Sequence, residues 1–289
     1  MAKIVARYIA NMPMPLQTGS PATILPHMTN LLIAGAGFLG SEIARQAAAD
    51  FHVTTLTKSG GDGSLACDLS SESDIKSLRD KIPTPDLIIH CASSGRGGPK
   101  AYQAIFVNGT RRLKETFPEA HLLFTSSTSV YHQTEGETVD ETSPTSPERE
   151  TSRLLLEAEK QVDTAARLAG LYGPERSVVL RKFLADEAVI EEDGRRTLNQ
   201  IHVQDAASAC LFLSKGQHFG IYNVTDDEPM SQLECYQGLA EHFDKPLPPT
   251  GERMLSRKRA WTHKSVQNTE LRDLGWTPKY PNFFDSLND

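Results

Sequence analysis

Three glycines in the run LLIAGAGFLG are spaced as a phosphate-binding turn would need. Gly35, Gly37 and Gly40 form G-x-G-x-x-G directly between an apolar run and a segment with helical period. In this pattern the first glycine allows a tight turn, the second lets the backbone approach a pyrophosphate, and the third permits close helix–strand packing. The helix N-terminus then presents free N–H groups to the phosphates. These glycines, with Phe38 and Leu39 between the last two, predict a dinucleotide-binding turn rather than a merely tight one.

The end of the next apolar run bears on which dinucleotide this turn would bind. An acidic side chain about 20 residues beyond the glycines would bind the ribose 2′-hydroxyl of NAD. The sequence there is Thr57-Lys58-Ser59, without a carboxylate. A lysine flanked by two hydroxyls suits a 2′-phosphate, so the sequence favours NADP over NAD, with a solvated loop lysine as the alternative. Asp68 and Leu69 are candidates to flank the adenine, although a plain turn aspartate fits the same pattern.

The elements that must position these residues alternate between short buried strands and helices. Strands are predicted at residues 30–35, 52–57, 86–92 and 121–127, and helices at 38–49, 71–82 and 101–117. The second helix opens with Ser71-x-x-Asp74, which resembles a capping box. Such alternation indicates βαβ units and a parallel sheet, so the expected fold class is α/β. After residue 170 the pattern loosens, which suits a smaller lobe.

Composition and charge exclude several classes of partner. The hydrophobic fraction of 38% and the charged fraction of 23% are typical of soluble globular proteins. A net charge of −7 without a long single-sign run argues against nucleic-acid and membrane-surface partners. No apolar run approaches the ~20 residues that span a bilayer. The four cysteines are scattered without metal-ligand spacing, which predicts reduced thiols in a cytoplasmic protein without a metal site.

A series of motifs follows the glycine-rich turn in a fixed order. They are CDLS, HCAS, FTSSTSVY, ARLAGLYGP, NQIHVQDAASACLFL and GIYNVTDDEP. Together with GAGFLG, this series resembles the extended short-chain dehydrogenases/reductases, namely the NAD(P)-dependent epimerase/dehydratase group, from about residue 30 to 283. Ala34, where many extended members carry glycine, resembles the atypical branch. The resemblance implies a doubly wound Rossmann-type sheet with a small C-terminal substrate lobe, and hydride transfer on a sugar, polyol or nucleotide-sugar-type substrate.

The resemblance also implies domain limits and further cofactor contacts. Residues 1–27, which contain four prolines, are expected to be a disordered N-terminal extension. Residues 28–289 would form the NAD(P)-binding domain, with a substrate lobe drawn mainly from about 171–200 and 218–289. Ala92, Ser93 and Ser94 match the family segment beside the nicotinamide ribose, and Tyr172 lies in a turn that matches the one beside the nicotinamide.

The family's proton-transfer residues are only partly present. Relatives use a Ser or Thr, a Tyr, and a Lys four residues after the Tyr, because a phenol with a pKa of ~10 needs a nearby cation to act as a base. Ser127 matches the Ser/Thr position, but no Tyr-x-x-x-Lys occurs anywhere in the chain. On the helix expected after Pro147, the two positions fall on Arg149 and Arg153. Arg153 keeps the positive charge, whereas Arg149 cannot accept a proton.

Two functional hypotheses follow from this departure. The first is an NAD(P)-dependent oxidoreductase or epimerase-like enzyme with a non-standard acid/base, in which Ser127, Tyr131 and Arg153 are the candidate catalytic residues. Tyr172, Glu148 and Glu150 are further candidates for the acid/base. The alternative is a non-catalytic NAD(P)-binding protein with a regulatory or redox-sensing role. By analogy with relatives, a homodimer through the helix after Pro147 is also expected.

Overall fold

The computed structural model describes residues 28–95, 97–145, 149–253 and 261–288, so the expected extension at 1–27 lies outside the described residues. At its centre is a seven-stranded sheet in the order β12-β7-β5-β4-β1-β2-β3, in which all neighbouring strands are parallel. The strands are β1 (Thr29–Ala34), β2 (Phe51–Thr57), β3 (Leu65–Ala66), β4 (Leu87–His90), β5 (His121–Ser127), β7 (Thr164–Leu168) and β12 (Gly220–Val224). This order is that of a doubly wound Rossmann-type sheet, so the expected fold class is confirmed.

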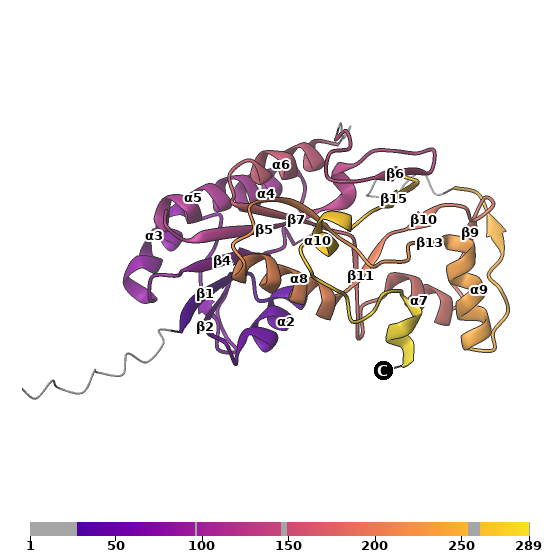
Figure 1. Cartoon of the computed structure of the whole chain (residues 1–289), viewed down its shortest axis with the longest axis horizontal. Helices are drawn as coiled ribbons and strands as arrows, with labels where there is room; N and C mark the ends of the chain where they lie inside the picture. The colour runs from indigo at the N-terminus through magenta and orange to yellow at the C-terminus, as the bar shows by residue number, and fades with distance from the viewer. Residues whose placement is uncertain (1–27, 96, 146–148, 254–260, 289) are drawn as a thin grey trace, which may run out of the picture.

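Helices cover both faces of the sheet because its central strands are apolar on both sides. In β1, Leu31 and Ile33 pack with α2 (Phe38–Ala47) and α8 (Val203–Lys215). The intervening Leu32 and Ala34 pack on the other face with α3 (Glu72–Lys81) and α5 (Asn108–Thr116). Figure 1 shows the two layers, with α6 (Glu150–Glu159) beside α5. The near-continuous apolar run of β1 is thus explained by burial on both faces.

The predicted elements recur with small shifts in their ends. Ser71 is the N-cap of α3, and its hydroxyl accepts a hydrogen bond from the N–H of Asp74 at 3.2 Å. The helix predicted at 101–117 is longer and less regular than expected. It consists of α4 (Pro99–Tyr102), a π-helical turn at Gln103–Val107, and α5.

A smaller lobe lies beyond the carboxyl ends of the sheet strands (Figure 1). Its elements are α7 (Val178–Leu184), β9 (Ile190–Glu191), β10 (Thr197–Leu198), β13 (Met230–Ser231), α9 (Gln232–His242) and β14 (Thr250–Gly251). Phe183, Ile190, Cys235, Leu239 and Phe283 belong to its separate core. Two short parallel pairs lie near it, β8 (Gly170–Tyr172) with β11 (Gln200–His202), and β6 (Glu137–Val139) with β15 (Lys264–Val266).

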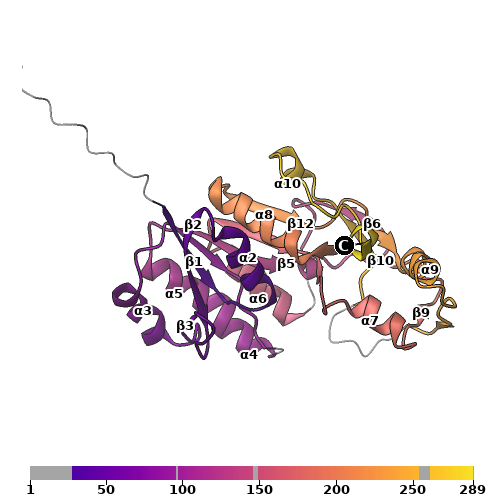
Figure 2. The same cartoon turned by 90° about the horizontal axis from the view of Figure 1, so that it is seen from below.

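The expected lobe limits of 218–289 need correction. β12 is an edge strand of the central sheet, paired with β7, and is not part of the lobe. Further along, α10 (Thr269–Asp273) returns to the Rossmann part, where Leu271 and Trp276 join the core beneath α8. The indole N–H of Trp276 donates to the Ser208 hydroxyl of α8 at 3.0 Å. Figure 2 shows α8 and α10 on the same side of the molecule. These apolar side chains are buried only if the chain crosses back.

Candidate functional site

The three glycines of the turn after β1 have separable roles. Gly35 has φ +116°, and a Cβ there would overlap the backbone of Ala92 after β4. A Cβ at Gly40 would overlap the carbonyl oxygen of Gly35. A Cβ at Gly37 would meet no atom of the described residues within 4 Å. Gly35 and Gly40 are therefore required by the protein's own packing, whereas Gly37 leaves open space where α2 begins. Gly37 is the N-cap of α2 and provides no side-chain cap, so the first N–H groups of the helix face that space.

The neighbouring strand β2 completes a cradle that fits a dinucleotide. The N–H groups of Gly35 and Ala36 both donate to the carbonyl oxygen of Leu56 at 3.0 Å, which holds the turn against the end of β2. At the next residue, the hydroxyl oxygen of Thr57 is buried and has no hydrogen-bond partner among the described residues. A buried hydroxyl without a partner is costly, and a nucleoside hydroxyl would satisfy it. The donor set and the free space beside Gly37 both fit NAD or NADP.

Two of the predicted cofactor residues bind each other. The Lys58 ammonium lies 2.9 Å from a carboxylate oxygen of Asp68, with the lysine side chain mostly exposed. Hydrogen bonds from Ser70 and then from Lys58 lower the pKa of Asp68 to about 2. A positive charge therefore does lie at the end of β2, but a carboxylate already accompanies it. Leu69, the next residue, is buried in the core under α5, so its side chain does not line this surface.

The segment after β4 lies against the glycine-rich turn. Ala92 is the residue that excludes a side chain at Gly35. Ser93 is exposed, and its hydroxyl accepts a hydrogen bond from the N–H of Gly95 at 3.2 Å. Ser94 is half-buried beside it. β4 and β1 are adjacent but their helices cover opposite faces, so these residues lie at the switch point where doubly wound sheets bind ligands. The side chain of Leu39 is buried in the core, which leaves its backbone N–H as the part able to reach a ligand.

The structure brings Ser127 close to the start of α6. Ser127 ends β5, and its hydroxyl oxygen accepts a hydrogen bond from the N–H of Ser129 at 3.2 Å. The hydroxyl of Ser152, in the first turn of α6, donates to the carbonyl oxygen of Ser129 at 3.3 Å. Arg149 is the N-cap of α6, and Arg153 lies exposed on its first turn. Pro147 and Glu148 lie outside the described residues. Ser127 and the two arginine positions therefore border one region.

Tyr131 does not reach that region, which contradicts its expected role as the acid/base. Its side chain is 0% exposed. Its hydroxyl donates to Asn223 Oδ1 at 2.8 Å and accepts from Arg167 Nη1 at 2.9 Å. Arg167 forms a buried ion pair with Glu159 at 2.7 Å. Burial raises the pKa of Tyr131, although Arg167 opposes the shift. The burial of this phenol, its raised pKa and its bonds within a buried network all argue against Tyr131 as the proton acceptor for a substrate.

Tyr172 is also turned away from the cofactor turn. Its ring packs in the core of the lobe against Phe283, with centroids 5.0 Å apart. Its hydroxyl donates to the carbonyl oxygen of Asn282 at 3.5 Å, and burial raises its pKa. The Tyr172 side chain is therefore directed into the lobe core, and the expected cofactor contact at this turn stays a prediction for its backbone. The backbone of the following residue does approach the turn, because a Cβ at Gly173 would lie 3.2 Å from the Phe38 ring.

Two cations near this region were not predicted. The Arg176 guanidinium lies over the ring of Phe38, 4.7 Å from the ring centroid. Lys264, on β15, is 4% exposed and donates to the carbonyl oxygen of Tyr131 and to the Thr262 hydroxyl, both at 3.1 Å. Burial, together with the charge of Arg196, lowers the pKa of Lys264 to about 8. For Arg176, its place four residues after Tyr172 was the available signal. For Lys264 no local pattern distinguishes it from a surface lysine.

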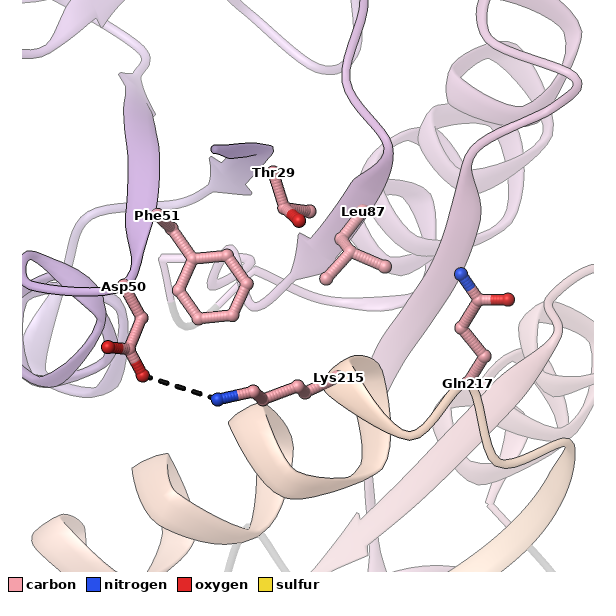
Figure 3. A pocket seen from close by; sticks show the side chains of 6 residues that line it. All are labelled: Thr29, Asp50, Phe51, Leu87, Lys215 and Gln217. Atoms are coloured by element: carbon pink, nitrogen blue, oxygen red, sulfur yellow. Dashed lines mark hydrogen bonds and ion pairs between the residues drawn. The ribbon is translucent and has the colours of Figure 1, made fainter. Parts of the chain in front are cut away.

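A cavity occurs at the opposite edge of the sheet, and we do not assign it a role in the site. Thr29, Phe51 and Leu87, at the amino ends of β1, β2 and β4, line it together with Asp50, Lys215 and Gln217. Figure 3 shows the ion pair between Lys215 and Asp50, at 3.3 Å, beside it. Ligands of doubly wound sheets bind at the carboxyl ends of the strands. In the described part of the chain, no group of three or more potential metal ligands occurs, and no helix has the length and hydropathy of a membrane span.

Comparison with known proteins agrees with this geometry. Protein YeeZ of Escherichia coli K12 is 30% identical over 280 residues, which cover 88% of this chain and 97% of YeeZ. The structure of an NAD-dependent epimerase/dehydratase from Methylobacillus flagellatus is 24% identical, with a TM-score of 0.73 over 90% of this chain and 97% of that one. Thermus thermophilus UDP-glucose 4-epimerase in complex with NAD is 20% identical, with a TM-score of 0.72 over 90% and 96%. Residues 31–225 match the family model, and the chain belongs to the NAD dependent epimerase/dehydratase family.

Proposed function

We propose that this protein is an NAD(P)-dependent oxidoreductase or epimerase-like enzyme that acts on an alcohol carbon of a sugar, polyol or nucleotide-sugar-type substrate. The observation that carries the proposal is the open space at Gly37 between two glycines that packing requires. A Cβ at Gly37 would meet no described protein atom within 4 Å, and the start of a helix is where backbone N–H groups can bind a pyrophosphate. The Thermus relative is a UDP-glucose 4-epimerase, which favours a substrate of related chemistry.

Different residues of the chain would bind the dinucleotide and take part in proton transfer. The N–H groups at the start of α2 would hold the phosphates, and the Thr57 hydroxyl would bond a ribose hydroxyl. The bound nicotinamide supplies the hydride acceptor or donor. Ser127 accepts one hydrogen bond from Ser129 and keeps its own proton to donate to the substrate oxygen. Arg153, at the position of the family's lysine, would provide positive charge near the reacting hydroxyl.

Titration of the purified protein with NAD⁺, NADH, NADP⁺ and NADPH tests the binding step. We expect micromolar or tighter binding of at least one reduced or oxidised form, followed by hydride transfer in a screen of sugar and polyol substrates. The change in near-ultraviolet absorbance of the reduced nicotinamide measures turnover. Failure to bind any of the four dinucleotides would exclude the proposal.

The second candidate function is a non-catalytic NAD(P)-binding protein with a regulatory or redox-sensing role. It is favoured by the inward position of Tyr131, since no other tyrosine of the described residues lies at the end of β5 to exchange a proton. This candidate predicts dinucleotide binding without turnover, and a preference for the oxidised or the reduced form. Ser127→Ala separates the two functions, because it lowers kcat in an enzyme and leaves dinucleotide affinity unchanged in both.

The preference for NADP over NAD is a further proposal, and Lys58 supports it. Its ammonium can contact a 2′-phosphate while Asp68 still holds the side chain near the end of β2. Lys58→Ala should weaken NADPH binding about tenfold and leave NADH binding within about twofold, as expected for one charge-assisted contact. Equal effects on both dinucleotides would contradict this preference. We also propose a homodimer through α6, which sedimentation velocity of the whole chain would detect.

A further inference from the structure

We propose that Arg176 binds the pyrophosphate of the dinucleotide and thereby closes the turn at residues 173–176 over the glycine-rich turn. The inference rests on the proposed cofactor binding and adds a residue from outside the family motif. The side chain of Arg176 comes from outside the Rossmann part. Arg176 belongs to the segment that leads into α7 of the smaller lobe.

The backbone aims Arg176 at the glycine-rich turn. Gly173 and Arg176 exchange two backbone hydrogen bonds, with N···O distances of 3.2 and 3.0 Å. Glu175, between them, has φ +59°, a left-handed conformation that side-chain-bearing residues rarely adopt. The resulting tight turn lies on Phe38, because a Cβ at Gly173 would be 3.2 Å from that ring. Reversal of the chain here is what returns the arginine toward α2.

The position of the guanidinium suits a ligand at Gly37. It lies 4.7 Å from the centroid of Phe38, the first residue of α2 and the neighbour of Gly37. The Phe38 ring is partly buried, and a cation over an aromatic ring is held less strongly than a guanidinium in a bidentate, charge-assisted contact with a phosphate. The Phe38 ring would therefore keep the arginine beside the open space until a stronger anionic partner arrives. The exposed side chain can make this short movement without disturbing the core.

The glycine-rich turn has too little positive charge of its own to balance a bound pyrophosphate. A pyrophosphate carries about two negative charges, whereas a helix N-terminus offers about half a positive charge. The segment from Leu31 to Ser41 contains no lysine or arginine. Within the described residues Arg176 has no carboxylate partner, and the acidic residue of α2, Glu42, is bonded to Arg45 at 2.6 Å. Arg176 is thus a cation close to the expected phosphate position, and no carboxylate in the described part of the chain pairs with it.

Binding of ADP-ribose, which has the pyrophosphate but lacks nicotinamide, tests the proposal in the full-length protein. We compare wild type, Arg176→Gln, Arg176→Lys and Arg181→Gln by isothermal titration at several KCl concentrations. Arg181, in α7 of the same lobe, is exposed and pairs with Glu187 at 3.1 Å, so its variant is a matched control. Arg176→Gln should weaken binding about tenfold, and Arg176→Lys should restore part of it. Affinity for Arg176→Gln should also fall less steeply with salt.

The outcomes separate this inference from the proposed function. If wild type binds no dinucleotide and no ADP-ribose, the proposed function itself fails. If wild type binds ADP-ribose and Arg176→Gln binds it as well as Arg181→Gln does, the inference about Arg176 is wrong. Unchanged ADP-ribose affinity with a raised KM for substrate would instead assign the guanidinium to an anionic group of the substrate, and would also overturn it. Melting temperatures equal to wild type exclude misfolding as the cause of a loss.

Discussion

Two regions at the carboxyl ends of the sheet strands depart from the family sequence pattern to very different degrees. We call the region around β1, β2 and β4 the cofactor edge, and the region around β5 and α6 the proton-transfer edge. Around β1, β2 and β4, the glycines keep the family's G-x-G-x-x-G pattern, and a Cβ at Gly37 would meet no described atom within 4 Å. Around β5 and α6, the sequence pattern matches Ser127 to the family's Ser/Thr position, and it predicts that Arg149 and Arg153 stand where relatives carry the tyrosine and the lysine. The nearby Tyr131 is bonded to Arg167 and Asn223 instead of facing a substrate. The phosphate-binding region keeps the backbone pattern of the family, whereas the region of proton transfer differs from it in its side chains.

This difference follows from what each edge requires. Phosphate binding uses backbone N–H groups and the absence of side chains, so few substitutions preserve it. Proton transfer uses one side chain with a suitable pKa, which several groups can provide if the geometry allows. The same fold can therefore keep its cofactor while its chemistry changes, and each edge can be tested by itself.

The largest effect is expected from breaking the buried ion pair behind the proton-transfer edge. Glu159→Ala would leave the Arg167 guanidinium, whose side chain is 4% exposed, without its partner. We expect the free energy of unfolding to fall by about 3–5 kcal/mol, measured by urea denaturation. The double variant Glu159→Met with Arg167→Met should recover most of this loss. A loss below about 1 kcal/mol in the single variant would mean that water satisfies the arginine.

The next effect concerns the cofactor edge alone. Gly37→Val adds a side chain where no atom of the described residues lies within 4 Å of the Cβ, at a φ of −86° that valine can adopt. The melting temperature should stay near wild type, while dinucleotide affinity falls about 100-fold because the side chain occupies the phosphate position. Gly40→Val is the matched variant, and it should destabilise the fold because its Cβ overlaps Gly35. Similar melting temperatures for the two variants would contradict the division of roles among the glycines.

A third effect is the pH dependence of stability from Lys264. Its pKa is about 8 in the folded state, below the ordinary value of 10.5. Below pH 8 the folded protein carries the cost of a buried ammonium. As the pH rises further, the unfolded chain keeps a proton that the folded chain has lost, so this contribution to stability increases. Between about pH 7 and pH 9.5, wild type should gain about 2 kcal/mol relative to Lys264→Met in urea unfolding. A pH-independent difference would mean that Lys264 stays charged.

The smallest effect is expected from Tyr131→Phe, and this variant tests directly whether Tyr131 takes part in proton transfer. Tyr131→Phe removes a hydroxyl that bonds two buried groups, so stability should fall by about 1–2 kcal/mol. Its kcat should stay within about threefold of wild type, whereas Ser127→Ala should lower kcat about 100-fold. Steady-state kinetics with the substrate found by screening would measure both. A loss of more than tenfold in kcat for Tyr131→Phe, with an intact fold, would restore Tyr131 as the acid/base.

Sequence reasoning succeeded where neighbouring residues act together. The strands, the Ser71 cap and the glycine-rich turn are encoded by periodicity and spacing within short segments. It did not predict the burial of Tyr131 and Tyr172, since position along the chain does not show which way a ring points. Both tyrosines lie near motif residues, yet burial among apolar side chains directs each into a core.

The sequence by itself determined the cofactor edge, because one run of six residues contains all three glycines and the start of α2. The proton-transfer edge was decided by tertiary structure. Tyr131 meets its partner Asn223 across 92 residues, and Lys264 reaches the Tyr131 carbonyl across 133 residues. Pairing of β12 with β7 brings Asn223 to Tyr131, and pairing of β15 with β6 brings in Lys264; burial then shifts the pKa values of such groups. Backbone-based binding is local and can be read from sequence, whereas side-chain chemistry depends on which distant segments meet.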